Sequence, residues 1–175
     1  MSPYQHEIKG LHHNAYRCRD SEETREFYEG VLGLRLANGF ALKATKTGRP
    51  IEAFHSFYEL DDGSFLAFFE VIDNGVDDFV FDQKSDFDLH IALAVSDRET
   101  LLSFKERVLA HSIEVRGPVD HEICHSIYVR DPNGYVIELA SPGDNCDLLM
   151  QNANRVAHAQ LADWQQNKHR SRRIL

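Results

Sequence analysis

The sequence predicts an α+β protein in which two tandem βαβββ units form a curved mixed sheet, followed by a C-terminal helix. Three observations favour this fold class: an internal repeat, short segments with alternating apolar positions, and two amphipathic stretches with helix-capping signals. The chain has 175 residues, of which 42% are apolar and 27% are charged. This length and composition suit one globular domain with its own core.

The repeat appears when the chain is displaced along itself by 77 positions. The matched pairs are then His13 with His90, Asp20 with Asp97, Phe27 with Phe104, Glu29 with Glu106, and Val31-Leu32 with Val108-Leu109. The displacement next falls to 70, which aligns His55-Ser-x-Tyr58 with His125-Ser-x-Tyr128, and an extra residue in the turn DPNG makes it 71. An ordered series of matches over whole elements indicates a structural repeat.

Each copy begins with a short strand, LHHNAYRC or DLHIALAV, and continues into a helix. In DSEETREFYEGVLG, Asp20 is the expected N-cap, Glu23 follows three residues later, and Gly33 stands just past the end. In SDRETLLSFKERVLA, Ser96 and Glu99 form the expected capping box, and the apolar residues share one helical face. Both helices are therefore predicted with defined ends.

A second strand follows each helix, LRLANGFAL or IEVRG, and a hairpin with the tight turn DDG or DPNG completes the unit. The units cover about 8–72 and 87–141, with the acidic segment Asp73–Asp88 as the linker, and together they form a domain over 1–143. Residues 144–175 are expected to form a terminal helix with an apolar stripe near Trp164, followed by the basic tail KHRSRR.

Charge and composition exclude several classes of partner. A net charge of −9 argues against nucleic acid. No apolar run approaches the roughly 20 residues that span a bilayer, and the start MSPYQHEIKG lacks the apolar core of a signal peptide, so we expect a cytoplasmic protein. The cysteines Cys18, Cys124 and Cys146 are odd in number and lack a CxxC pair, which suits reduced thiols.

Strand alternation places three possible metal ligands on one face of the sheet. In DLHIALAV the alternate apolar residues are expected beneath the helix, so His90 takes the open, concave face, and the repeat gives His13 the same orientation. On the last strand Glu138 takes this face as well, whereas His12 is one residue out of phase. A single histidine is more often structural, but two imidazoles and one carboxylate on one face are a ligand set for Fe(II), Mn(II) or related ions.

The first copy offers a different surface at the corresponding strand. Ala67 stands where the second copy has Glu138, so a fourth ligand is missing. Phe65 and Phe69 share the concave face with Ala67, which suits an aromatic substrate. Arg17 shares the face of His13, and Arg17 or the basic loop KATKTGRP is a candidate for binding a substrate carboxylate.

With these residues the chain resembles the vicinal oxygen chelate superfamily, which includes glyoxalase I, extradiol dioxygenases, methylmalonyl-CoA epimerase, fosfomycin-resistance proteins and bleomycin-sequestering proteins. The resemblance covers 8–141 and is carried by GLHHNAYRCRDSEETREFYEGVLGL, DLHIALAVSD and SIYVRDPNGYVIELAS. It implies that the two units surround a metal-binding cup with His13, His90 and Glu138 as the ligands. Fe(II) is the first choice of ion, with Mn(II), Zn(II) or Ni(II) as alternatives.

The resemblance favours an extradiol-type ring-cleaving dioxygenase that acts on a catechol- or hydroquinone-like aromatic. That branch has a tyrosine ten residues before its glutamate, the spacing of Tyr128 from Glu138, whereas glyoxalases and epimerases have a carboxylate or amide where this chain has Ala67. No histidine lies between His55 and His90, where catechol cleavers place a general base. Tyr128 and His125 are therefore the candidate catalytic residues, with His121 as a second candidate base.

Three alternatives stay open: a glyoxalase-type lyase or isomerase, a fosfomycin-resistance-type thiol transferase, and a non-enzymatic protein that sequesters small molecules. In each case the expected partner is a small molecule, with no nucleic acid or membrane, and a homodimer is expected. The two units can close one cup within a chain or exchange across a dimer, in which case His90 serves a partner's site. The apolar stripe near Trp164 is then a dimer contact or a lid on the sheet.

Overall fold

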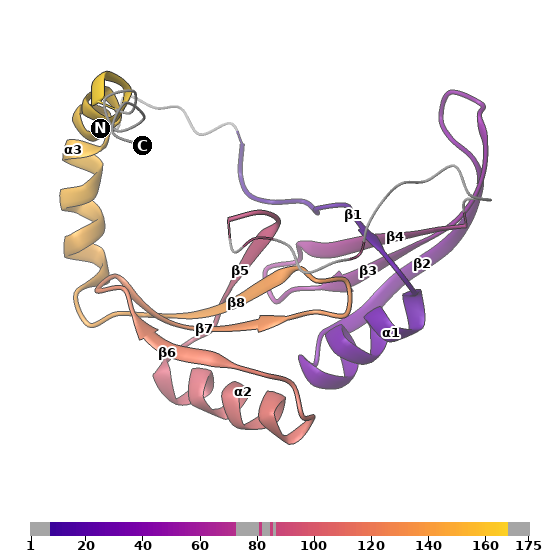
Figure 1. Cartoon of the computed structure of the whole chain (residues 1–175), viewed down its shortest axis with the longest axis horizontal. Helices are drawn as coiled ribbons and strands as arrows, with labels where there is room; N and C mark the ends of the chain where they lie inside the picture. Colours follow the sequence, from indigo (N-terminus) through magenta and orange to yellow (C-terminus); the bar gives the residue numbers. More distant parts are fainter. Residues whose placement is uncertain (1–7, 73–80, 82–84, 86, 168–175) are drawn as a thin grey trace, which may run out of the picture.

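The structure is a computed structural model that describes residues 8–72, 81, 85 and 87–167. Its strands form two four-stranded mixed sheets, with the orders β1-β4-β3-β2 and β5-β8-β7-β6 (Figure 1). In each sheet the first strand runs parallel to its neighbour and the other pairs are antiparallel. The predicted α+β fold of two βαβββ units is confirmed, with one sheet for each unit.

The first unit consists of β1 (Tyr16–Cys18), α1 (Ser21–Arg25), the π-helical segment η1 (Glu26–Val31), β2 (Arg35–Ala44), β3 (Pro50–Glu59) and β4 (Phe65–Ile72). The second consists of β5 (His90–Ala94), α2 (Arg98–Ala110), β6 (Arg116–Asp120), β7 (Cys124–Arg130) and β8 (Val136–Pro142). The predicted terminal helix is α3 (Cys146–Asn167). Most of the predicted linker and the basic tail lie outside the described residues.

The helix starts confirm one predicted cap and correct the other. The Asp20 carboxylate accepts hydrogen bonds from two backbone N–H groups of the first turn, at 2.8 and 2.9 Å. The predicted capping box of Ser96 and Glu99 is wrong, because Asp97 is the N-cap of α2 and accepts from the backbone N–H of Thr100 at 2.7 Å. A charged carboxylate is the stronger acceptor, and the Ser96 hydroxyl instead donates to it.

Both sheets have one covered face and one open face. In Figure 1, α1 and α2 lie on the same side of the sheets, and the opposite side is open. On β5 the half-buried Ile91 and Leu93 alternate with the exposed His90, Ala92 and Ala94, as the sequence predicted. The main core packs on the covered side and contains residues of both units. Among the helices of the described ranges, none is long and apolar enough to cross a membrane.

A buried polar network joins the two units. The DPNG turn of the second unit lies against the first: the Tyr28 hydroxyl donates to Asp131 at 3.0 Å, and the backbone N–H of Arg19 donates to Asn133 at 2.8 Å. The Tyr135 hydroxyl also donates to the carbonyl of Arg17, at 2.6 Å. Asp131 and Asn133 are buried, so this network fixes how the units meet within a chain.

The hairpins of the two units align one residue differently from the sequence match. Phe57 lies opposite Ala67, and Tyr128 lies opposite Glu138, which corresponds to a displacement of 71 positions on both strands. The displacement of 70 and the extra residue in the DPNG turn are therefore wrong. Because strand side chains alternate, a slip of one residue exchanges the two faces, so Phe57 rather than Tyr58 corresponds to Tyr128.

The core explains why this register is preferred. Tyr58 is fully buried on the covered side, where its ring packs 5.4 Å from that of Tyr28 and 6.0 Å from that of Phe68, centroid to centroid. The alternation then directs His55 and Phe57 to the open side. The two similar stretches beginning at His55 and His125 therefore present opposite faces.

Candidate metal centre and aromatic cavity

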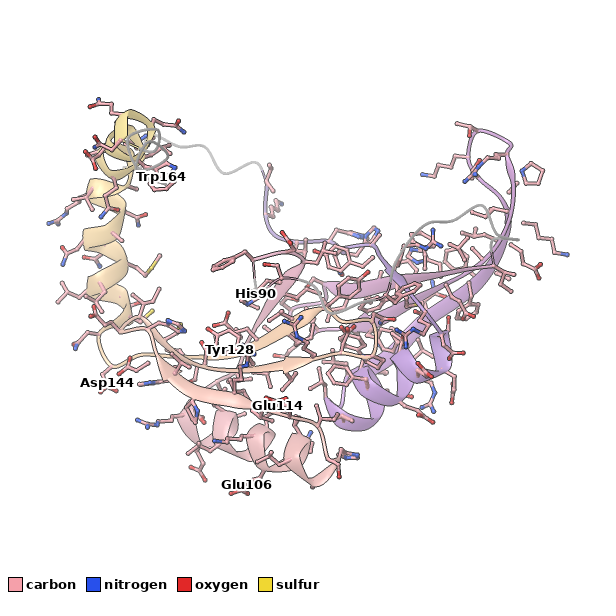
Figure 2. The ribbon with its side chains drawn as sticks, viewed as in Figure 1. His90, Glu106, Glu114, Tyr128, Asp144 and Trp164 are labelled. Atoms are coloured by element: carbon pink, nitrogen blue, oxygen red, sulfur yellow. The ribbon has the colours of Figure 1, made fainter. Side chains whose placement is uncertain are left out.

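The second unit gathers four polar side chains on its open side. Because β8 pairs with both β5 and β7, Glu138 lies between His90 and Tyr128. Glu138 Oε2 is 2.7 Å from His90 Nε2, and its Oε1 is 3.2 Å from the Tyr128 hydroxyl. His121 Nε2, from the turn between β6 and β7, is 2.6 Å from the same hydroxyl. Figure 2 shows His90 and Tyr128 on this side of the second sheet.

The hydrogen bonds of this cluster form a chain. Since the Tyr128 hydroxyl donates its one proton to Glu138, its oxygen is left to accept from His121 Nε2–H. Burial, followed by the nearby Glu138 carboxylate, raises the pKa of Tyr128, so this phenol keeps its proton. This series of hydrogen bonds links the exposed His121 to the half-buried Glu138. It is suited to moving a proton between solvent and the pair formed by His90 and Glu138.

His90 and Glu138 fit a divalent metal as a pair. Nitrogen and oxygen ligands about 2.1 Å from one ion and at right angles lie about 3 Å apart, close to the observed separation of 2.7 Å. An imidazole and a carboxylate are also chemically suited to Fe(II), Mn(II) or Zn(II). In the described part of the chain, no group of three or more His, Cys, Asp or Glu side chains could hold a metal ion. Within one copy, the described residues thus bring together two of the three predicted ligands, His90 and Glu138.

The third predicted ligand, His13, lies on the other unit. It forms an isolated parallel bridge with Phe65, and its ring centroid is 5.6 Å from that of Phe57 and 6.4 Å from that of His55. Its Nδ1 is 2.7 Å from His12 Nδ1. The structure thus brings His90 and Glu138 together and places His13 with a different set of side chains. That all three bind one ion stays a prediction.

An aromatic cavity of about 590 Å³ occupies the open side of the first unit. His13 and Arg17 line it, as does Phe69. Other lining residues are Phe40, Leu42, Ile51, His55 and Phe57. Phe65 stands edge-on to Phe57, with centroids 6.1 Å apart. The predicted substrate residues Arg17, Phe65 and Phe69 therefore lie in or beside one cavity.

His55 is a buried wall of this cavity, with 6% of its surface exposed. Its ring stacks on Phe69 with centroids 3.6 Å apart, and its Nδ1 is 2.9 Å from the carbonyl oxygen of Phe68. Because a carbonyl can only accept, Nδ1 carries the proton and Nε2 is the basic nitrogen. Burial lowers the pKa of His55, so the neutral ring is favoured.

This burial predicts a pH dependence of stability. As the pH falls below about 6.5, the ordinary pKa of histidine, the unfolded chain takes up the His55 proton before the folded one does. The free energy of unfolding should therefore fall from that pH down to the lowered pKa. We expect His55→Phe to make this decline shallower in urea titrations at several pH values, with substitution of the exposed His111 as control. An unchanged slope would contradict the assignment.

The two candidate bases of the second unit lie in different places. His125 pairs with Asp120, and its Nδ1 is 3.8 Å from the Asp120 carboxylate. Because it is three residues from Tyr128 on the same strand, its side chain lies on the opposite face of the sheet. The structure does not bring it to Glu138, and its catalytic role stays a prediction. His121 contacts Tyr128 directly. The sequence did not indicate the contact of His121, because His121 lies in a turn, where strand alternation gives no orientation. It did not indicate that His55 lines the cavity, because the repeat was aligned one residue out of register.

The sequence is similar to a known protein family and to one of the curated proteins. The model of the Glyoxalase/Bleomycin resistance protein/Dioxygenase superfamily matches residues 10–139. A "Probable lactoylglutathione lyase" of Vibrio parahaemolyticus serotype O3:K6 is 27% identical over 132 residues, which cover 73% of this chain and 86% of the relative.

Solved structures share the fold at lower identity. The fosfomycin resistance protein FosX of Listeria monocytogenes, complexed with Mn(II) and sulfate, is 20% identical with a TM-score of 0.56, over 81% of this chain and 98% of that one. An antibiotic-binding protein from Streptomyces sp. CB03234 is 17% identical with a TM-score of 0.56, over 78% of this chain and 98% of that one. A fosfomycin resistance protein and an antibiotic-binding protein thus share this architecture.

Proposed function

Because the chain belongs to the Glyoxalase/Bleomycin resistance protein/Dioxygenase superfamily, we propose that it is a divalent-metal-dependent dioxygenase that cleaves a catechol- or hydroquinone-like ring. The aromatic cavity carries this proposal. Its volume of about 590 Å³ is that of a small-molecule site. Walls of phenylalanine suit a flat ring, and Arg17 lines the same cavity, which supports its proposed role in binding a carboxylate of the substrate.

We propose that His13 from one copy and His90 and Glu138 from a second copy hold Fe(II), or Mn(II), Zn(II) or Ni(II). The two open faces carry complementary parts: His13 beside the aromatic cavity on one unit, and the close pair of His90 and Glu138 on the other. When bound, the ion supplies Lewis acidity that lowers the pKa of the substrate hydroxyl.

The residues of the chain would then bind the substrate and move its proton. Phe57 and Phe69 hold the ring, and Arg17 orients it through a carboxylate, because a guanidinium binds that group with two parallel hydrogen bonds. Tyr128, which keeps its own proton, would hydrogen-bond the substrate oxygen, and the exposed His121, 2.6 Å from the Tyr128 hydroxyl, would take up the hydroxyl proton and release it to solvent. The apolar walls exclude water from the ring.

A glyoxalase-type lyase or isomerase is the second candidate, supported by the 27% identity to the Vibrio relative. The residue at the position of the fourth ligand, Ala67, argues against the lyase. Ala67 lies opposite Phe57 as Glu138 lies opposite Tyr128, and it is fully buried. The structural register thus supports the sequence argument that this site has three ligands, which favours the dioxygenase.

An anaerobic purification with metal analysis, followed by assays of the metal-loaded protein, tests the proposal. We expect oxygen uptake with a panel of catechols and hydroquinones, and no conversion of the hemithioacetal of methylglyoxal and glutathione. Conversion of the hemithioacetal without oxygen uptake would replace the proposal by the lyase. Ligand binding by a protein that takes up no metal would replace it by a sequestering role, and thiol transfer to fosfomycin would replace it by a transferase.

The polar chain predicts different effects for two neighbouring histidines. His121→Ala removes the group that contacts Tyr128 and should lower kcat by about 100-fold, the lower range for a positioned acid or base, with partial rescue by added imidazole. His125→Ala tests the other candidate base; because its Nδ1 faces Asp120, this variant should leave kcat within a few-fold of wild type, and His111→Ala, at an exposed histidine, is the control. Steady-state kinetics measure both, and the reverse ranking would assign the proton step to His125.

A further inference from the structure

Two arms extend from the open side of the molecule, at opposite ends. One is α3, and the other is the hairpin formed by β2 and β3; both rise away from α1 and α2 (Figure 1). Side chains of α3 remain exposed along its length, including Leu148, Val156 and Trp164, with 59%, 44% and 63% of their surfaces accessible. Helices in proteins gain most of their stability from packing an apolar face, so α3 needs a covering surface.

A concavity of about 480 Å³ lies at the foot of α3. Its rim carries the exposed carboxylates of Asp120, Glu122 and Asp144, and Leu148 and Leu149 line its α3 side. The concavity therefore has three carboxylates at its edge and two leucines inside, and the half-buried His125 and the exposed Asn145 complete its lining. Figure 2 shows Asp144 at the base of the helix and Trp164 near its far end.

The tip of the β2–β3 hairpin has the opposite charge. Lys43, Lys46 and Arg49 are exposed there, and the described residues form no salt bridge with any of the three. The turn is held by backbone hydrogen bonds from Thr45 N–H to the Arg49 carbonyl at 2.8 Å and from Gly48 N–H to the Thr45 carbonyl at 2.9 Å. The tip thus presents positive charge on an ordered turn, in a chain with a net charge of −9.

We propose that the β2–β3 hairpin tip of one copy seats in the acidic concavity at the foot of α3 of a second copy. The arms rise on one side at opposite ends, so a two-fold rotation that brings two open faces together places each hairpin against the other copy's α3. Both contacts then form at once, as an isologous dimer requires. Lys46 and Arg49 meet Glu122 and Asp144, and the partner covers the apolar residues of α3.

The same rotation lays the first unit of each copy over the second unit of the other. The inference therefore rests on the proposed function, in which His13 of one copy joins His90 and Glu138 of another. It adds the contact that fixes the pairing. Residues outside the metal centre would set the register of the two copies, so that a ligand pair in one copy meets the aromatic cavity of the other.

Sedimentation velocity on the full chain with a charge-swap series tests the contact. Wild type is expected to be a dimer whose dissociation constant rises at least about 10-fold from low to high salt, because exposed charges are screened. The hairpin variant Lys46→Glu/Arg49→Glu and the rim variant Glu122→Lys/Asp144→Lys should each raise the dissociation constant by about 10- to 100-fold through like-charge contacts. The combined quadruple variant should regain most of the lost affinity between the two copies.

The control is Glu106→Lys/Glu114→Lys, which makes the same change of charge as the rim variant but at two exposed positions outside the rim; circular dichroism checks that every variant is folded. The proposal is overturned by a monomeric wild type, by a dimer indifferent to salt and to both reversals, or by a quadruple variant no better than the doubles. A dimer that shows the charge swap but binds no metal would support the contact and contradict the proposed function.

Discussion

Replacing Glu138 by alanine is expected to abolish metal binding and to lower activity by at least about 100-fold. Residues that only support metal ligands are worth about 10- to 100-fold in affinity or activity, so loss of the sole carboxylate of the set should cost at least the upper figure. Glu138 also accepts the Tyr128 proton and pairs with His90, so its removal breaks the polar chain as well. Metal content after dialysis and turnover of the reloaded protein measure the effect.

Glu106→Ala is the matched control, since Glu106 is exposed on α2, on the covered side of the sheets (Figure 2). It should leave metal content and turnover unchanged. Stoichiometric metal in the Glu138→Ala protein would show that this carboxylate is not a ligand, and the proposed centre would have to be abandoned.

The same substitution also tests whether the centre is shared. Glu138→Ala and His13→Ala should each be inactive alone, but a mixed dimer contains one site with both defects and one intact site. Coexpression of the two variants should therefore restore part of the activity. If the site were built within one chain, the mixture would stay as inactive as its components.

The second large effect is expected at the junction of the units. Asp131 accepts four hydrogen bonds, from the backbone N–H groups of Asn133 and Tyr135, the Asn133 side chain and the Tyr28 hydroxyl, at 2.8 to 3.0 Å. Asp131→Ala leaves these donors buried without an acceptor. Since each unsatisfied group costs about 1–3 kcal/mol, we expect a loss of about 3 kcal/mol or more in the free energy of unfolding.

Urea denaturation measures this loss, and Asp61→Ala is its control. Asp61 lies in the corresponding turn of the first unit but is exposed, so its substitution should change the free energy of unfolding by less than about 0.5 kcal/mol. Equal effects of the two variants would show that the network contributes nothing specific to the junction. A large loss only for Asp131 would confirm that the units are joined by buried polar contacts.

The fold and part of the site could be predicted because the repeat matches the apolar and polar positions of the two units as well as identical residues. His90 and Glu138 were placed on one face by alternation along two neighbouring strands, and the 2.7 Å contact agrees. The cap at Asp97 was concealed because Ser96 fits the capping pattern one residue earlier. Local patterns of this kind do not decide between adjacent acceptors when a charged one competes.

The register of the hairpins could not be predicted for a different reason. Identical residues at His55 and His125 favoured a displacement of 70 positions, whereas packing of Tyr58 in the core favoured 71. The register follows the burial of the large aromatic ring, which contributes on the order of 2 kcal/mol or more to stability. Identity of residues in the two units has no such effect on the register. The contact between His121 and Tyr128 depends on a turn, and no periodicity indicates where a turn side chain points.

The offset between the hairpins has an implication for how a duplicated gene can diverge. Two stretches that share the pattern His-Ser-x-Tyr have their faces exchanged: His55 lines the aromatic cavity, whereas Tyr128 donates to the carboxylate of Glu138. One added or deleted codon before such a strand is enough for this exchange, because the pleat has a period of two. New walls for a hollow can thus arise in one step, without any amino acid being replaced.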